Sequence, residues 1–111
     1  DLRLTRRLLR DYYYRGTAAE ETLKMWDYVL RGEDLYIRPY RIYADRHVNS
    51  VHNYEPFLYR DALCRLLEHP DSDSPYHETI ERLRACAAFF FPIDQSLIPP
   101  ASLIQEFIKQ N

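Results

Sequence analysis

The chain has 111 residues, of which 46% are hydrophobic and 29% are charged, and its formal net charge is −2. These values are ordinary for a globular chain with one modest core, and the slightly acidic balance argues against general binding to nucleic acid. No apolar run approaches the roughly eighteen residues that a membrane span needs. We therefore expect neither a nucleic-acid partner nor a membrane partner.

The first predicted element is a helix over residues 2–14 that ends at Gly16, a residue suited to a helix C-cap. This segment carries five arginines, which are Arg3, Arg6, Arg7, Arg10 and Arg15. Residues three and four apart are neighbours on a helix, so the first four arginines lie on or beside one face. Guanidinium groups bind phosphate oxygens in pairs. An anion-binding face and a solvated basic face both fit this spacing.

A second helix is predicted from Thr17, because Thr17 and Glu20 have the spacing of a capping box. Apolar residues repeat along it at helical spacing, at Leu23, Trp26, Val29 and Leu30. Gly32 ends or loosens this helix, and a further turn is expected over residues 33–38.

Residues 43–51 are the best candidate for a strand. They follow Pro39, contain β-branched residues and end before the polar Asn53. Arg46 and His47 interrupt the alternation of apolar and polar residues that a half-buried strand shows.

The remainder of the chain is predicted to be helical. One helix is expected over residues 55–68, another over residues 75–89 before Pro92, and a last one over residues 101–109. The Asp- and Ser-containing stretch 70–75 is expected to be a turn-forming linker.

The other reactive side chains favour no catalytic centre. Cys64 and Cys86 lie in apolar contexts with no metal-binding spacing, and we interpret them as buried, reduced thiols of a cytoplasmic protein. His47 and His52 could form half of a metal site, but no third ligand has suitable spacing, so no metal site is predicted. The tyrosines at positions 12–14 fit packing against other helices better than stacking on a base.

The arginine block of residues 1–16, D-x-R-L-x-R-R-x-x-R-D-x-x-x-R-G, resembles the lid segment of uridine kinases and related P-loop nucleoside kinases. The likeness covers nearly the whole chain and is nearest to bacterial uridine kinase-like proteins whose kinase is the C-terminal part of a longer polypeptide. Further matching blocks follow in order: A-E-E-T-L-x-M-W (19–26), Pro39-Tyr40, Ala44-Asp45, Asn49-Ser50 and I-P-P-x-S-L-I-x-E-F-I (98–108).

The resemblance implies a fold that is mainly α with one or two short strands, as the C-terminal part of an α/β P-loop kinase. Residues 1–16 would be the lid helix and residues 17–111 a helical remainder. The family's phosphate loop, G-x-x-x-x-G-K-[ST], is absent, because neither Gly16 nor Gly32 is followed by lysine. We therefore expect the chain to be inactive alone.

In such a parent enzyme, the γ-phosphate of ATP passes to the 5′-hydroxyl of uridine or cytidine with the help of Mg. ATP, nucleoside and Mg would be bound by the parent, and none of them by this chain alone. Carried over by position, Arg7, Arg10 and Arg15 match the catalytic lid arginines that contact phosphate. Arg3 and Arg6 belong to the same block and are expected to contact the phosphates of the cofactor.

A different class of function also fits the sequence. The chain could be a helical protein-interaction or oligomerisation module without catalysis, which uses an exposed apolar and tyrosine surface. Under either interpretation we expect a homo-oligomer.

Overall fold

The regular elements of the chain are helices. A computed structural model describes residues 1–109. The α-helices are α1 (Leu2–Arg15), α2 (Ala19–Tyr36), α3 (Glu55–Leu66) and α4 (His77–Ala88), and the 3-10 helices are η1 (Arg38–Tyr43), η2 (Gln95–Leu97) and η3 (Leu103–Phe107). No strand occurs within these 109 residues. The predicted fold, with one or two short strands as part of an α/β kinase, is therefore wrong.

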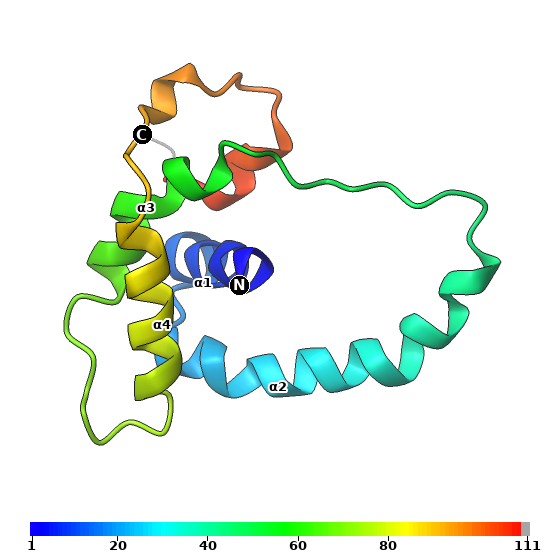
Figure 1. The fold of residues 1–111 in the computed structure, drawn as a ribbon, viewed down its shortest axis with the longest axis horizontal. Coiled ribbons are helices and arrows are strands. Elements are labelled where there is room, and N and C mark those ends of the chain that lie inside the picture. Colours follow the sequence, from blue (N-terminus) through cyan, green and yellow to red (C-terminus); the bar gives the residue numbers. More distant parts are fainter. Residues whose placement is uncertain (110–111) are drawn as a thin grey trace.

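Helix α1 lies at the centre of the fold. Figure 1 shows it nearly end-on, between α2 and the α3–α4 pair. Its leucines point into two adjoining core clusters: Leu4 and Leu8 pack with α2, α3 and α4, and Leu9 packs with α3 and the C-terminal segment. Leu9 is completely buried. Burying each such leucine contributes about 1.5–3 kcal/mol, so the leucine pattern explains why α1 is fixed in the core.

The end of α1 agrees with its prediction. Gly16 adopts a left-handed conformation with φ of 63°, and its backbone N–H donates to the carbonyl oxygen of Asp11. Glycine enters this region without the steric cost that a Cβ imposes, so Gly16 reverses the chain into α2.

Helix α2 begins later and ends later than predicted. Its N-cap is Ala18, and no side chain caps it, so the predicted capping box of Thr17 and Glu20 is wrong. The helix continues through Gly32 to Tyr36 before η1 begins. Only its first half packs on the core, where Leu23 is buried.

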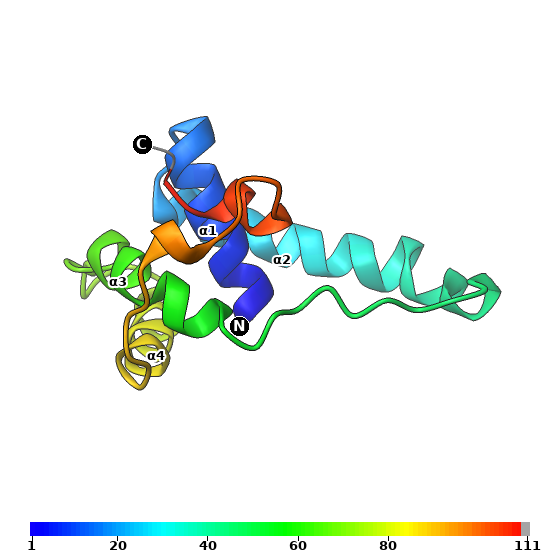
Figure 2. The ribbon, with the colours of Figure 1, turned by 90° about the horizontal axis from the view of Figure 1, so that it is seen from above.

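Residues 34–51, here called the arm, project from the rest of the molecule. Figures 1 and 2 show the end of α2, η1 and a long return segment extending away from α1, α3 and α4. Every residue from Asp34 to Val51 is exposed. The strand predicted over residues 43–51 is wrong: η1 extends to Tyr43, and residues 44–53 have no regular structure. A strand needs a neighbouring strand for its backbone groups, and no described segment forms a ladder of backbone hydrogen bonds with this one.

The last predicted helix is also wrong in extent. Instead of a helix over residues 101–109, the structure has the short 3-10 helix η3, whose N-cap Ser102 accepts a hydrogen bond of 3.3 Å from the backbone N–H of Ile104. Its apolar residues do reach the core, because Ile104, Phe107 and Ile108 are buried. Helices α3 and α4 match their predictions to within two residues at each end.

The two cysteines are free thiols, as predicted, but they are not both buried. Cys64 is half-buried against the first core cluster, whereas Cys86 is exposed. The tyrosines at the end of α1 pack edge-to-face on one another, and Tyr14 donates to the carbonyl oxygen of Ile108.

Candidate functional site

The arginines of α1 occupy the side of the helix that its buried leucines leave free. Arg3, Arg6, Arg7 and Arg10 line one cleft of about 220 Å³, together with Trp26, Val29 and Phe107. We call this the arginine cleft. Its floor includes two aromatic rings: the Arg3 guanidinium lies 5.7 Å from the centre of the Trp26 ring, and that of Arg6 lies 5.2 Å from the centre of the Phe107 ring. These distances are within the range of cation–π attraction.

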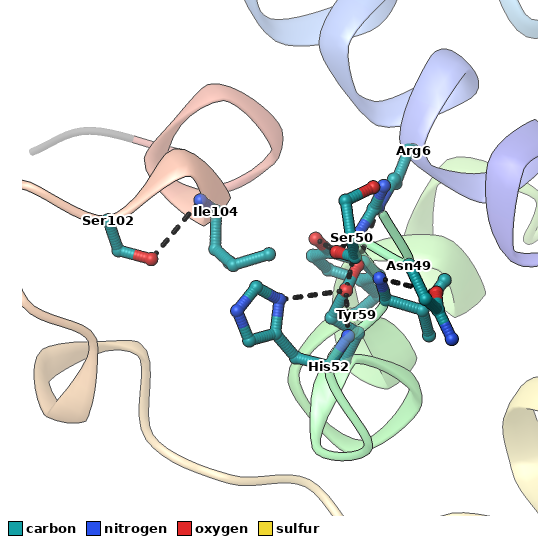
Figure 3. Close-up of polar contacts among 9 residues, drawn as sticks. Arg6, Asn49, Ser50, His52, Tyr59, Ser102 and Ile104 are labelled. Atoms are coloured by element: carbon teal, nitrogen blue, oxygen red, sulfur yellow. Dashed lines mark hydrogen bonds and ion pairs between the residues drawn. The ribbon is translucent and has the colours of Figure 1, made fainter. Parts of the chain in front are cut away.

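Arg6 is held by Glu55, the first residue of α3. Its Nε donates to Oε2 at 2.7 Å and its Nη2 to Oε1 at 2.5 Å, which is a bidentate pair. Glu55 is completely buried, and it also accepts from the backbone N–H of His52 at 2.7 Å and from the hydroxyl of Tyr59 at 3.0 Å. The ring Nδ1 of His52 lies 3.4 Å from its Oε1. Figure 3 shows this cluster between α1 and α3.

The ionisation of the Glu55 cluster follows from these contacts. Burial raises the pKa of Glu55, but the hydrogen bonds from Arg6, His52 and Tyr59 outweigh burial and hold that pKa below its ordinary value. Burial and the neighbouring Glu55 carboxylate raise the pKa of the Tyr59 hydroxyl. Glu55 is therefore ionised at neutral pH, and Arg6 forms an ion pair with it.

Arg7 is paired within its own helix. Its Nε donates to Asp11 Oδ2 at 2.7 Å, while Arg15 Nη1 donates to Asp11 Oδ1 at 3.0 Å from the other side. Asp11 is buried and also accepts from the Thr22 hydroxyl of α2 at 3.3 Å. This carboxylate thus neutralises part of the charge that two of the predicted phosphate-contacting arginines carry.

Arg3 pairs with Glu33 at the surface of the molecule. It forms a bidentate pair with Glu33 of α2, with N–O distances of 3.1 and 2.7 Å. The Arg3 side chain is 56% exposed and that of Glu33 is half-buried, so water competes for the pair mainly at Arg3. The hydrogen bond from Arg3 is the main cause that lowers the pKa of Glu33.

Arg10 differs from the other four arginines. Within residues 1–109 no carboxylate lies in ion-pair distance of it, and its Nε is shielded from solvent without a hydrogen-bond partner. A buried donor without a partner is costly, by about 1–3 kcal/mol. Because of Arg10, the arginine cleft contains a positive charge and an N–H donor that no group among the described residues matches.

The structure groups four of the five predicted site residues and separates one. Arg15 lies at the end of α1 and lines a second cleft with Arg7, outside the arginine cleft. The sequence interpretation did not identify Glu55, Glu33 or Trp26 as neighbours of the arginines. The pairing of Asp11 could have been predicted from the sequence, because Asp11 lies four residues from both Arg7 and Arg15.

No metal-binding cluster accompanies these arginines. In the described part of the chain, no three His, Cys, Asp or Glu side chains are grouped so that they could hold a metal ion. None of the helices formed by residues 1–109 combines the length and apolarity needed to cross a bilayer.

Comparison with known proteins adds no relative. No protein-family model, no curated protein and no solved structure matches the chain.

Proposed function

We propose that the arginine cleft binds a phosphate group. We further propose that the chain contributes phosphate-contacting arginines to the ATP-dependent phosphorylation of a nucleoside such as uridine or cytidine, in the cytoplasm. The observation that carries the first step is Arg10, which lines the cleft and whose solvent-shielded Nε has no partner among residues 1–109. The second step is supported by the likeness of residues 1–16 to a nucleoside kinase lid.

The charges around the cleft favour an anion. Four arginines of α1 line the cleft, and within residues 1–109 three carboxylates pair with them, those of Asp11, Glu33 and Glu55. One positive charge, that of Arg10, is therefore unmatched in the described part of the chain. A phosphate oxygen at Arg10 would receive charge-assisted hydrogen bonds, which are worth about 1.5–3 kcal/mol each. The Trp26 and Phe107 rings would partly shield such bonds from water.

The binding step is tested by calorimetric titration with inorganic pyrophosphate at constant ionic strength. Arg10→Gln should weaken binding at least about tenfold, which corresponds to the loss of one charge-assisted hydrogen bond. Arg15→Gln is the matched control, because it removes the same charge from the same helix outside the arginine cleft. Equal weakening by the two variants would show that only the overall charge of α1 attracts the anion.

The catalytic step has its own test. We expect the purified chain to show no turnover of ATP and uridine, because it has no phosphate loop. Measurable phosphorylation by the chain, abolished by Arg10→Gln, would contradict this expectation and place a complete active site here.

A second candidate function is self-association through the arm. Its exposed surface includes eight large apolar residues: Leu35, Tyr36, Ile37, Tyr40, Ile42, Tyr43, Val48 and Val51. An apolar surface of this kind drives association when a second copy can cover it. Light scattering over a range of concentrations tests this candidate. The molar mass should rise with concentration in the unaltered chain and stay at the monomer value when Ile42 and Tyr43 are both replaced by serine.

A further inference from the structure

Both ends of the arm are attached to the arginines that line the cleft. At the α2 end, Arg3 holds Glu33, the residue that precedes the arm. At the α3 end, Arg6 Nη2 donates to the carbonyl oxygen of Ser50 at 2.9 Å, and Figure 3 shows Arg6 reaching across to this segment. Neighbouring arginines on one face of α1 therefore hold the two ends of an otherwise exposed segment.

The two attachments differ in how easily an incoming anion can replace the carboxylate that each arginine binds. Arg6 is 12% exposed and is fixed by the buried Glu55, so releasing it would leave an unpaired charge in the core. The Arg3–Glu33 pair lies at the surface, with Arg3 exposed and Glu33 half-buried, and surface pairs contribute little. An anion that enters the cleft can therefore displace Glu33 from Arg3 but not Glu55 from Arg6.

The Glu33 carboxylate meets Arg3 as a phosphate would. Its two oxygens accept from the two terminal nitrogens of one guanidinium, which is the bidentate geometry that carboxylates and phosphates share. Glu33 also faces a cation of the arm, because its Oε1 lies 4.0 Å from Arg38 Nε. When it leaves Arg3, Glu33 still has Arg38 as a partner.

We propose that Glu33 is an internal competitor for phosphate: it occupies Arg3 when the cleft is empty, and phosphate binding releases Glu33 and loosens the α2 end of the arm. This inference rests on the proposed phosphate binding and adds a regulatory contact to it. The coupling is reciprocal, so anything that fixes the arm against α1 weakens phosphate binding by the same factor. The competing pair lies at the surface, so the factor is modest, about two- to fivefold.

The test combines pyrophosphate titration with two variants of adjacent acidic residues. Glu33→Gln removes the competitor. Asp34→Asn is the matched control, because it also removes one negative charge at the root of the arm, but Asp34 pairs with Arg38 and not with α1. Trp26 is the only tryptophan of the chain and lies under Arg3, so its fluorescence reports the displacement of that arginine. Ionic strength is kept constant with NaCl, because salt alone screens exposed pairs.

We expect pyrophosphate to bind Glu33→Gln about two- to fivefold more tightly than the unaltered chain, and Asp34→Asn to bind like the unaltered chain. Saturation with pyrophosphate should also speed hydrogen exchange of the backbone amides of residues 33–40. If binding depends on Arg10 but Glu33→Gln changes neither the affinity nor the exchange, the competitor role is wrong and the phosphate site stands. If pyrophosphate binds neither chain, both proposals fail.

Discussion

The two ion pairs that Arg3 and Arg6 form lie one turn apart on α1, yet they belong to different parts of the molecule. Arg6 and Glu55 join α1 to α3 within the core, where the carboxylate is completely buried. Arg3 and Glu33 join α1 to the root of the exposed arm. The same pair of residue types is thus a fixed element of the fold in one place and an exchangeable contact in the other. Burial decides between the two roles.

Removing the buried acid should have the largest effect. Glu55→Gln leaves the Arg6 charge unpaired in the core and should lower the free energy of unfolding by about 3–5 kcal/mol, measured by urea denaturation. Combining it with Arg6→Met should recover part of this loss, because the double variant leaves no unpaired charge. A loss below about 1 kcal/mol for Glu55→Gln would mean that the pair is not buried in solution.

Truncating apolar side chains should lower the free energy of unfolding in the core but not in the arm. Leu9→Ala removes a completely buried side chain and should lower the free energy of unfolding by about 2–5 kcal/mol. Ile42→Ala truncates a side chain that is 80% exposed and should change it by no more than about 0.5 kcal/mol. Both are measured by urea denaturation at low protein concentration. A comparable loss for Ile42→Ala would reveal that the arm is covered in solution.

Acid should weaken the core pair before the chain unfolds. The pKa of Glu55 is lower in the folded chain than in the unfolded chain, so its contribution is complete above the ordinary value of 4.5. That contribution is lost as the pH falls through the folded-state pKa. Unfolding midpoints in urea at steps from pH 7 to pH 3 should therefore fall at the acidic end. The fall should be shallower in Glu55→Gln, and equal slopes would contradict the ionised state of Glu55.

Removing the exposed cation should have the smallest effect on stability. Arg3→Gln breaks the pair with Glu33 and the contact with the Trp26 ring, and because the Arg3 side chain is 56% exposed, water weakens both interactions. Its unfolding midpoint in urea should be indistinguishable from that of the unaltered chain. A clear loss would show that the root of the arm is part of the cooperative fold, contrary to the exchangeable contact inferred for it.

Local signals in the sequence predicted α1 well. Its leucine spacing, its arginine spacing and the glycine at its end all act within one or two helical turns. The boundaries of α3 and α4 followed from similar patterns. The grouping of Arg3, Arg6, Arg7 and Arg10 on one cleft was likewise predictable, because helical spacing alone places them together.

Features that depend on distant segments could not be predicted in this way. Residues 43–51 are the best candidate for a strand in the sequence, but a strand forms only beside another, and no described segment pairs with this one. The pairing of Arg6 with Glu55 joins residues 49 positions apart, for which no spacing rule exists. That Arg10 has no carboxylate partner in the described part of the chain could be recognised only after the partners of its neighbours were known.

The stability of the chain in the presence of pyrophosphate tests the proposed anion site most directly. A ligand that binds only the folded state raises its stability, by about 2.7 kcal/mol at a concentration one hundred times the dissociation constant. With ionic strength held constant, pyrophosphate should raise the thermal unfolding midpoint of the unaltered chain and of Arg15→Gln. It should leave that of Arg10→Gln nearly unchanged. An equal rise in Arg10→Gln, or no rise in any of the three, would contradict a phosphate site in the arginine cleft.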